Sequence, residues 1–242
     1  MLMDVLTFSF QYWISTDWYI ALLMSFSVNL VTYSVTASLI SSITGFLHTR
    51  KGMGEYLDQR PLYKNQVRSE IFYGVFACLI FSVASLATRL LYSGIWPESI
   101  FSLVLQFVAF TVFYEIYSYF IHRFLHLDVF RKVHFVHHKS VRVTPWGAYS
   151  VHPVEAMLIG ASAPIFMCVF PMSLAVVLFF HLLGMVFTML IHSNYTLNQA
   201  SLFSKIFNAY STGHALHHKK GSVNYGFVSP ALDRILKTKE DN

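Results

Sequence analysis

Apolar residues fill four long stretches of this chain, and polar residues gather in the segments between them. The first three stretches cover about residues 18–46, 71–92 and 99–121, and each is long enough to cross a bilayer as a helix. The fourth, residues 154–192, exceeds one span and is broken by Pro164 and Pro171, so it predicts a helical hairpin that turns near Phe170. The pattern therefore predicts an all-α polytopic membrane protein with four to five transmembrane helices.

The first 17 residues are apolar and aromatic but too short to span a membrane, and Trp13 and Trp18 lie near their end. Aromatic side chains favour the headgroup level, so this segment predicts an interfacial helix. The N-terminus shows no basic region or cleavage site typical of a signal peptide. Cys78 and Cys168 lie in apolar runs, which argues against a disulfide framework.

Composition supports a membrane protein, because 55% of the 242 residues are hydrophobic, 12% are charged and the mean hydropathy is +0.51. The length fits a single membrane domain over residues 1–242. All Lys and Arg residues except Arg89 fall within residues 48–70, 122–153 and 193–242. These segments lie on one face in the predicted topology, and the positive-inside rule makes that face cytoplasmic. The net charge of +5 therefore indicates topology and no nucleic-acid partner. A bacterial inner membrane is the favoured location, and the endoplasmic reticulum membrane is the alternative.

Histidines form three clusters in these polar segments: His122 with His126, His134 with His137 and His138, and His214 with His217 and His218. On a helix, residues three and four apart share a face, so each cluster is expected to present its rings together. Neutral imidazole is the commonest metal-binding side chain, and eight rings exceed the need of one ion. The clusters predict a cytoplasmic helical cap that binds two metal ions. Zinc, iron, copper and nickel all suit such ligands.

Four further histidines have different expected roles. His192 lies at the end of the hairpin beside the clusters and is a candidate ligand, and His152 is a candidate ligand or a residue that supports one. His181 precedes His192 by about 16 Å along a helix, which favours a role in a substrate channel or in helix packing. His48 is expected to be an ordinary loop residue.

Carboxylates near the clusters are candidate partners for the ligands, because a ligating histidine generally donates its other N–H to a carboxylate or carbonyl. Glu115 lies two turns before His122 on the same face of an apolar span, where a carboxylate is costly and usually functional. Asp128 and Glu155 are further candidates, with pairing to basic residues at the surface as the alternative.

Taken together, these motifs resemble those of the fatty acid hydroxylase/sterol desaturase superfamily of integral-membrane di-iron enzymes. The resemblance covers about residues 111–238, after an N-terminal part, 1–110, of interfacial and transmembrane helices. Its motifs in order are Glu115 with Tyr119, His122-Arg123-x-x-His126, His134-x-x-His137-His138-Lys139-Ser140, Thr144-Pro145-Trp146, His152-Pro153-x-Glu155, His192-Ser193-Asn194, His214-x-x-His217-His218 and Asn224-Tyr225-Gly226. The closing segment departs from the family's Trp-Asp-Arg-x-Phe-Gly-Thr, because it begins Leu232-Asp233-Arg234 and lacks the aromatic and the glycine.

The resemblance implies two iron ions, with zinc as a substitute in purified protein. The implied ligands are His122, His126, His134, His137, His138, His152, His192, His214, His217 and His218. Glu115, Glu155 and Asn194 are the residues implied to lie around them. The implied reaction is O₂-dependent hydroxylation of a fatty acyl, sterol or related lipid, with desaturation as the alternative. Its two electrons would come from a separate electron-transfer protein and reductase.

The lipid would occupy an apolar slot between the third span and the hairpin, and exposed lysines such as Lys132, Lys139 and Lys219 would dock an acidic electron carrier. The positive-inside rule alone explains these lysines equally well. The sequence contains no haem-binding His-Pro-Gly-Gly and no dinucleotide-binding Gly-x-Gly-x-x-Gly.

Three other functions are weighed against an oxygenase. A haem cytochrome requires paired histidines on facing spans, and the clusters lie outside the apolar runs. A metal transporter requires ionisable ligands in mid-membrane, where only His181 and Glu115 are expected. A zinc-dependent lipid hydrolase would show a motif such as His-Glu-x-x-His, which this sequence lacks. The oxygenase is therefore preferred.

Overall fold

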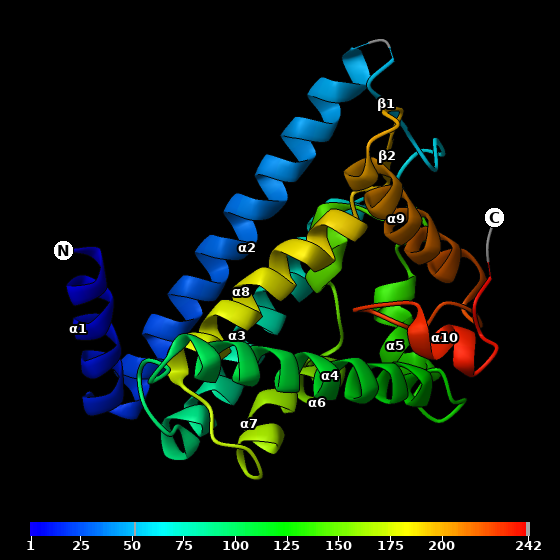
Figure 1. The fold of residues 1–242 in the computed structure, drawn as a ribbon. Coiled ribbons are helices and arrows are strands. Elements are labelled where there is room, and N and C mark those ends of the chain that lie inside the picture. Colours follow the sequence, from blue (N-terminus) through cyan, green and yellow to red (C-terminus); the bar gives the residue numbers. More distant parts are fainter. Residues whose placement is uncertain (51, 241–242) are drawn as a thin grey trace.

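The computed structural model describes residues 1–50 and 52–240, so Lys51 of the predicted basic loop lies outside the described residues. Helices dominate it (Figure 1). They are α1 (Leu2–Ser15), α2 (Trp18–Thr49), α3 (Gln66–Leu91), α4 (Ile100–Leu125), α5 (Arg131–His138), the 3₁₀ helix η1 (Pro145–Tyr149), α6 (Pro153–Gly160), α7 (Ser162–Met167), α8 (Leu174–Ile191), α9 (Leu202–Lys220) and α10 (Ala231–Ile235). The predicted all-α class is confirmed. The sequence did not predict a short antiparallel ribbon of β1 (Gly54–Tyr56) and β2 (Tyr195–Leu197).

Four helices, α2, α3, α4 and α8, are long and apolar enough to cross a membrane, as predicted. Only 11% to 33% of the most apolar part of each helix is buried inside the protein. Helices that are apolar all round and yet exposed suit a hydrocarbon environment, where the backbone hydrogen bonds are satisfied within each helix.

The predicted hairpin is present, and its turn between Met167 and Leu174 contains Pro171. Its first limb does not break at Pro164, as expected, but at Ala161, between α6 and α7. Pro164 lies in the first turn of α7, where the missing N–H of a proline costs no intrahelical hydrogen bond.

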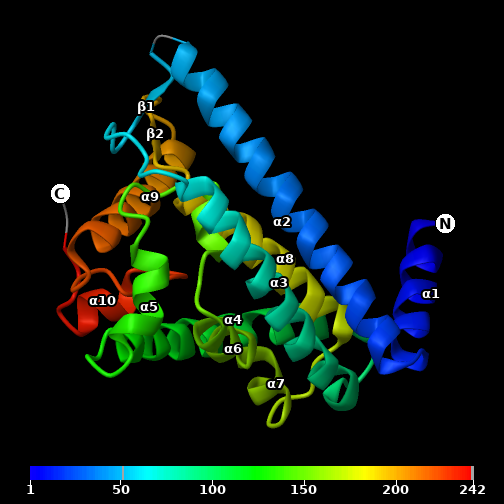
Figure 2. The same cartoon turned by 180° about the vertical axis from the view of Figure 1, so that it is seen from behind.

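The three basic segments gather at one end of the helices. The β1–β2 pairing joins Gly54 to Leu197, and the loop after α9 reaches back to α4 through a hydrogen bond from His122 to the carbonyl of Tyr225. The turn between α3 and α4 meets the hairpin turn at the opposite end, through a bridge of Gly94 with Ser173 (Figure 2). The common end agrees with the predicted topology, and its cytoplasmic orientation stays a prediction.

Arg89, the basic residue outside those segments, lies near the opposite end. Its guanidinium donates to the carbonyls of Ile14 and Thr16 at the C-terminal end of α1 and lies 5.5 Å from the centroid of the Trp13 ring. Carbonyls at a helix C-terminus attract a cation, so this arginine fixes the interfacial helix against α3.

Packing between α2, α3 and α8 forms one core, around residues such as Tyr33, Ala77 and Met189. The Tyr33 hydroxyl donates to the carbonyl of Trp146 at 3.0 Å, and Gly74 leaves room for its ring. A second core lies near the hairpin turn, around Phe110 and other apolar residues. From that core α4 and α8 diverge toward α5 and α9, as Figure 1 shows. The space between them is where the site described next lies.

Candidate metal centre and lipid cavity

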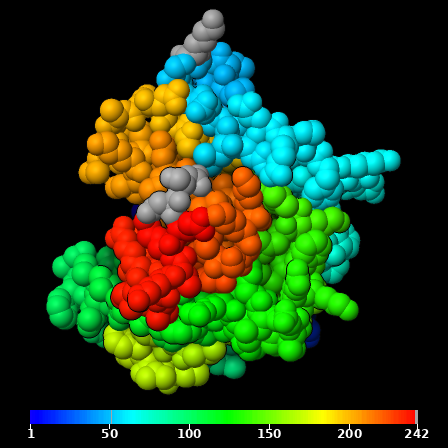
Figure 3. Space-filling view, turned by 90° about the vertical axis from the view of Figure 1, so that its right-hand side faces the viewer, coloured from blue at the N-terminus to red at the C-terminus, as the bar shows by residue number. Residues whose placement is uncertain are grey.

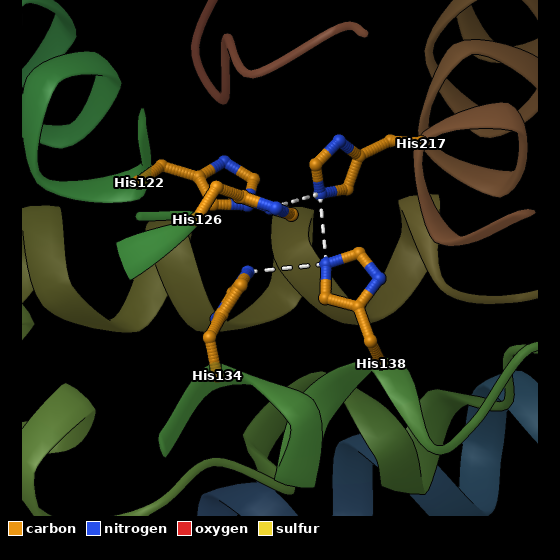
Figure 4. A group of neighbouring side chains, drawn as sticks. All are labelled: His122, His126, His134, His138 and His217. Atoms are coloured by element: carbon orange, nitrogen blue, oxygen red, sulfur yellow. Dashed lines mark hydrogen bonds between the residues drawn. The ribbon is translucent and has the colours of Figure 1, made fainter. Parts of the chain in front are cut away.

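Nine of the ten predicted ligands meet in the space between α4, α5, α9 and the C-terminal end of α8. They form two groups, and within each group one ligand atom per residue lies within 4.8 Å of all the others. The first group is His122, His126, His134, His138 and His217 (Figure 4), and the second is His137, His192, His214 and His218. The C-terminal segment and α9 cover this end of the molecule in Figure 3.

The helix pitch divides two of the predicted clusters between the groups, so the expectation that each cluster presents its rings together is wrong for α5 and α9. Residues four apart lie nearly above one another, so His134 and His138 share the first group, whereas His137 points to the second. In α9, His214 and His218 share the second group, and His217 joins the first. Each of these helices therefore contributes to both groups.

Hydrogen bonds fix the orientation of four rings. Backbone carbonyls accept from three Nδ1–H groups: Tyr225 from His122 at 2.8 Å, Thr188 from His192 at 2.7 Å and Val223 from His217 at 2.6 Å. The carboxylate of Glu155 accepts from the Nδ1–H of His134 at 2.9 Å. An imidazole that donates from Nδ1 presents a lone pair at Nε2, which is the arrangement of a metal ligand with its supporting hydrogen bond.

The Nε2 atoms face one another within each group. In the first group, the Nε2 atom of His138 lies 3.1 Å from that of His134 and 3.0 Å from that of His217, and both neighbours present lone pairs. A single proton on Nε2 of His138 can form a hydrogen bond with at most one of these two lone pairs. In the second group, His214 lies 2.9 Å from His192 and 3.1 Å from His218.

A shared cation resolves this convergence of lone pairs. Two ligands at right angles around an ion with metal–nitrogen distances of about 2.1 Å lie about 3 Å apart, close to the separations found here. The Nε2 atom of His122 is buried and has no hydrogen-bond partner among the described residues. The two groups therefore fit two metal ions with imidazole ligands.

Burial favours the neutral form of several of these rings. It lowers the pKa of His126 to about 3, of His138 to about 2 and of His192 to about 4. Neighbouring imidazoles, His134 above all, lower the first two further, because like charges repel. Neutral rings need lose no proton to bind a metal at neutral pH.

Two buried carboxylates that the sequence analysis did not single out hold the surrounding segments. Glu70 is fully buried and accepts from the side chains of Gln66, Ser140 and Thr144 at 2.6–2.8 Å, so it fixes the segment that follows α5. The sequence could have indicated a structural role for Glu70, because a carboxylate beside an apolar span is costly unless it is paired.

Asp233 is the second of these carboxylates. It accepts from the backbone N–H groups of Tyr225 and Gly226 at 2.9 and 2.8 Å and from the Thr238 hydroxyl at 2.7 Å. Because the Tyr225 carbonyl holds His122, Asp233 positions a histidine of the first group through one intermediate residue. Asp233 lies in the closing segment that departs from the family's motif.

The other predicted partners bind elsewhere. Glu115 accepts from the backbone N–H and hydroxyl of Ser229, at 3.0 and 2.7 Å, and so fastens the loop before α10 to α4. Asn194 adopts a positive φ of 56° and exchanges two hydrogen bonds of 2.9 Å with the backbone of Asp58. Both side chains support the site through backbone segments, and among the described residues neither is hydrogen-bonded to a grouped histidine.

Three more predicted residues lie outside both groups. His152 caps α6, where its Nδ1 accepts from the N–H of Val154 at 3.2 Å. Asp128 is exposed in the turn after α4. His48 lies in the last turn of α2, so its expected place in a loop is wrong, and it packs on the Tyr56 ring with 4.5 Å between centroids.

An apolar cavity of about 810 Å³ leads from the histidines into the membrane-spanning region. His122, His134 and His137 line one end of it, and Phe110 and Phe180 line its middle. The cavity reaches both histidine groups and is lined by the third span and the hairpin, as predicted, but α1, α2 and α3 line it as well, through residues such as Trp13, Asn29 and Phe81. Its volume and apolar lining are typical of a site for a lipid-sized ligand.

A family model described as fatty acid hydroxylase matches residues 107–238, which is more than half of the chain. The chain belongs to the fatty acid hydroxylase family. Human lathosterol oxidase is 31% identical over 183 residues, covering 71% of this chain and 60% of that protein. A Delta(7)-sterol 5(6)-desaturase of Gibberella zeae is 29% identical over 180 residues, covering 70% and 55%.

A more distant relative, sphinganine C4-monooxygenase 1 of Arabidopsis thaliana, is 26% identical over 215 residues, covering 85% of this chain and 82% of that protein. The chain therefore spans less than two thirds of the length of the human and Gibberella relatives, 60% and 55%. No solved structure matches it.

Proposed function

We propose that this family member is a membrane-bound di-iron enzyme that uses O₂ to hydroxylate a C–H bond of a fatty acyl, sterol or related lipid. The observation that carries the proposal is the meeting of two all-imidazole groups with an apolar cavity, because His122, His134 and His137 belong both to the groups and to the cavity wall. Imidazole also suits zinc, and the family resemblance selects iron. When bound, the iron pair supplies the activation of O₂ that an unactivated C–H bond requires.

The residues of the chain supply binding, orientation and exclusion of water. The grouped Nε2 atoms would hold the ions, while Glu155 and the carbonyls of Tyr225, Thr188 and Val223 hold the rings in the ligating tautomer. The cavity walls position an aliphatic segment beside His122 and keep bulk water from the reacting carbon.

Desaturation on the same site is the second candidate, and the sterol 5(6)-desaturase among the relatives favours it. Both reactions consume one O₂, two electrons and two protons. Hydroxylation places one oxygen atom in the lipid and releases one water, whereas desaturation removes two hydrogens and releases two waters. The fate of oxygen therefore separates the two.

Two functions of another class fit the geometry poorly. Two axial histidines of a haem hold their ligating nitrogens about 4 Å apart on opposite sides of a macrocycle, whereas Nε2 atoms here lie as close as 2.9 Å among several rings. A transporter needs ligands along a path through the membrane, but Glu115 is bound to Ser229 and His181 to Asn29.

Electrons would reach the site from a separate electron-transfer protein and its reductase. Arg131, Lys132 and Lys219 are exposed on α5 and α9, the helices that carry the six histidines of the second and third clusters. An acidic carrier would dock there electrostatically, on the face that the positive-inside rule assigns to the cytoplasm. A bacterial inner membrane stays the favoured location.

The test is lipid mass spectrometry of cells grown under ¹⁸O₂ that express the wild type, His137→Ala or the control His48→Ala at matched levels. We expect one lipid to gain one labelled oxygen with the wild type and the control, and not with His137→Ala. Loss of two hydrogens without label would select the desaturase. No lipid change together with no iron in the purified protein would refute the di-iron enzyme.

A further inference from the structure

A polar cluster lies deep among the membrane-spanning helices, away from the histidine groups. It joins α2, α3 and α8 through the side chains of Ser25, Asn29, Ser82, Ser85 and His181. Among these, Ser25, Asn29, Ser85 and His181 line the apolar cavity, as does Trp13 of α1. Polar groups are costly in such surroundings unless they are paired or bind a ligand.

Hydrogen bonds within the cluster fix the role of His181. The Asn29 amide nitrogen donates to the Ser25 carbonyl at 3.0 Å and to the Ser82 hydroxyl at 3.2 Å, so the Asn29 carbonyl oxygen faces His181. The Nε2–H of His181 donates to that oxygen at 2.7 Å. A neutral ring that donates from Nε2 presents a lone pair at Nδ1, and nothing in the described part of the chain donates to it.

Ser25 has its partners within the cluster. Its hydroxyl oxygen accepts from the Trp13 indole N–H at 2.9 Å. The one hydrogen of the Ser85 hydroxyl goes to the Ser82 carbonyl at 2.7 Å, so the Ser85 oxygen, 3.0 Å from that of Ser25, is free to accept the hydrogen of Ser25. A cluster that only holds helices together would pair all of its groups, whereas this one leaves an acceptor, Nδ1 of His181, on a residue that lines the cavity.

We propose that His181 binds the hydroxyl group of the lipid substrate in the part of the cavity remote from the histidine groups. A hydroxyl is a small neutral donor that an apolar cavity accommodates, and it would donate to Nδ1 of His181. The ligand class is an apolar chain or ring system that carries an alcohol at one end. This assignment rests on the proposed function only in naming that alcohol as the substrate.

The position of the cluster also limits where the lipid reacts. His181 precedes His192 by about 16 Å along α8, and His192 lies 3.4 Å from His137 between Nε2 atoms, at the histidine end of the cavity. Each carbon–carbon bond of an extended chain advances roughly 1.25 Å along its axis, so about a dozen bonds cover that distance. The oxidised carbon is therefore remote from the hydroxyl.

Binding to purified wild-type protein in detergent tests the site without turnover. Tritiated octadecan-1-ol and tritiated cholesterol are the two probes, each displaced by the unlabelled alcohol or by its O-methyl ether, which cannot donate. We expect the alcohol to compete about fivefold to tenfold better than the ether for the probe that binds, which is the value of one hydrogen bond. The probe that binds distinguishes a chain from a ring system.

Variants separate recognition from packing. His181→Phe should abolish the preference for alcohol over ether, His181→Gln should retain much of it, and Thr111→Val, elsewhere in the cavity wall, should leave it unchanged. Binding of neither alcohol, equal competition by alcohol and ether, or an unchanged preference in His181→Phe would overturn the proposal. Because the assay needs no iron or turnover, failure of the proposed function would leave this result intact.

Discussion

The hydrogen bond from His134 to Glu155 offers the sharpest test of the metal centre. In Glu155→Gln, one amide oxygen still accepts from the Nδ1–H of His134 at a site where the wild-type separation is 2.9 Å. The amide nitrogen would replace Oε2, which is buried and has no hydrogen-bond partner among the described residues, so the substitution breaks no other hydrogen bond. The change therefore removes mainly the negative charge behind one ligand.

The expected magnitude follows from that loss. Hydrogen bonds to charged groups contribute about 1.5–3 kcal/mol and neutral ones about 1 kcal/mol, so the substitution should cost about 1–2 kcal/mol of metal binding. That cost corresponds to a loss of affinity of about fivefold to thirtyfold, which overlaps the losses of roughly tenfold to hundredfold seen when carboxylates behind ligating histidines are replaced. The loss should fall on the first group, to which His134 belongs.

Anaerobic competition between the protein and a chromophoric Fe(II) chelator measures this affinity. The matched control is Glu115→Gln, because both oxygens of Glu115 bond to Ser229 and neither contacts a histidine. The melting temperature of each variant in detergent shows whether the fold is retained. Wild-type iron affinity in Glu155→Gln, or an equal loss in Glu115→Gln, would refute the argument that Glu155 supports a metal ligand.

Two further predictions address the metal stoichiometry and the core. His217→Ala removes a ligand from the first group and His214→Ala removes one from the second. Each variant should therefore lower the iron content from about two ions per chain to about one, measured by elemental analysis. Loss of both ions in either variant would contradict two separable sites. Gly74→Ala places a Cβ atom 2.3 Å from the Tyr33 hydroxyl oxygen and should cost about 1–3 kcal/mol, seen as a lower melting temperature in detergent. Gly45→Ala, with open space around its Cβ, is the matched control and should melt as the wild type does.

The number and placement of the spanning helices followed from the sequence. A stretch of about 20 apolar residues satisfies its backbone in lipid only as a helix, so α2, α3, α4 and α8 were predictable without knowledge of their neighbours. The hairpin turn near Pro171 and the common end of the basic segments followed for the same reason. The break at Ala161 was missed because we expected it at Pro164. A proline usually interrupts a helix, but it is tolerated in the first turn, where Pro164 lies.

The histidines themselves were visible in the sequence, and their division into two groups was not. That division depends on which face of α5 and α9 meets α4 and α8, and so on packing between helices far apart in the chain. The same holds for the carboxylates: Glu115 and Glu155 both seemed suited to support a ligand, but only Glu155 reaches a grouped histidine.

Sequence by itself thus determined the membrane helices, the common end of the basic segments and the presence of imidazole clusters, because these depend on local hydrophobicity and side-chain chemistry. Tertiary structure alone decided which rings lie together, which carboxylate bonds to them and where the cavity ends. Those features depend on the angles at which α4 and α8 diverge, and distant side chains such as Asn29 and His181 meet only after the helices have packed.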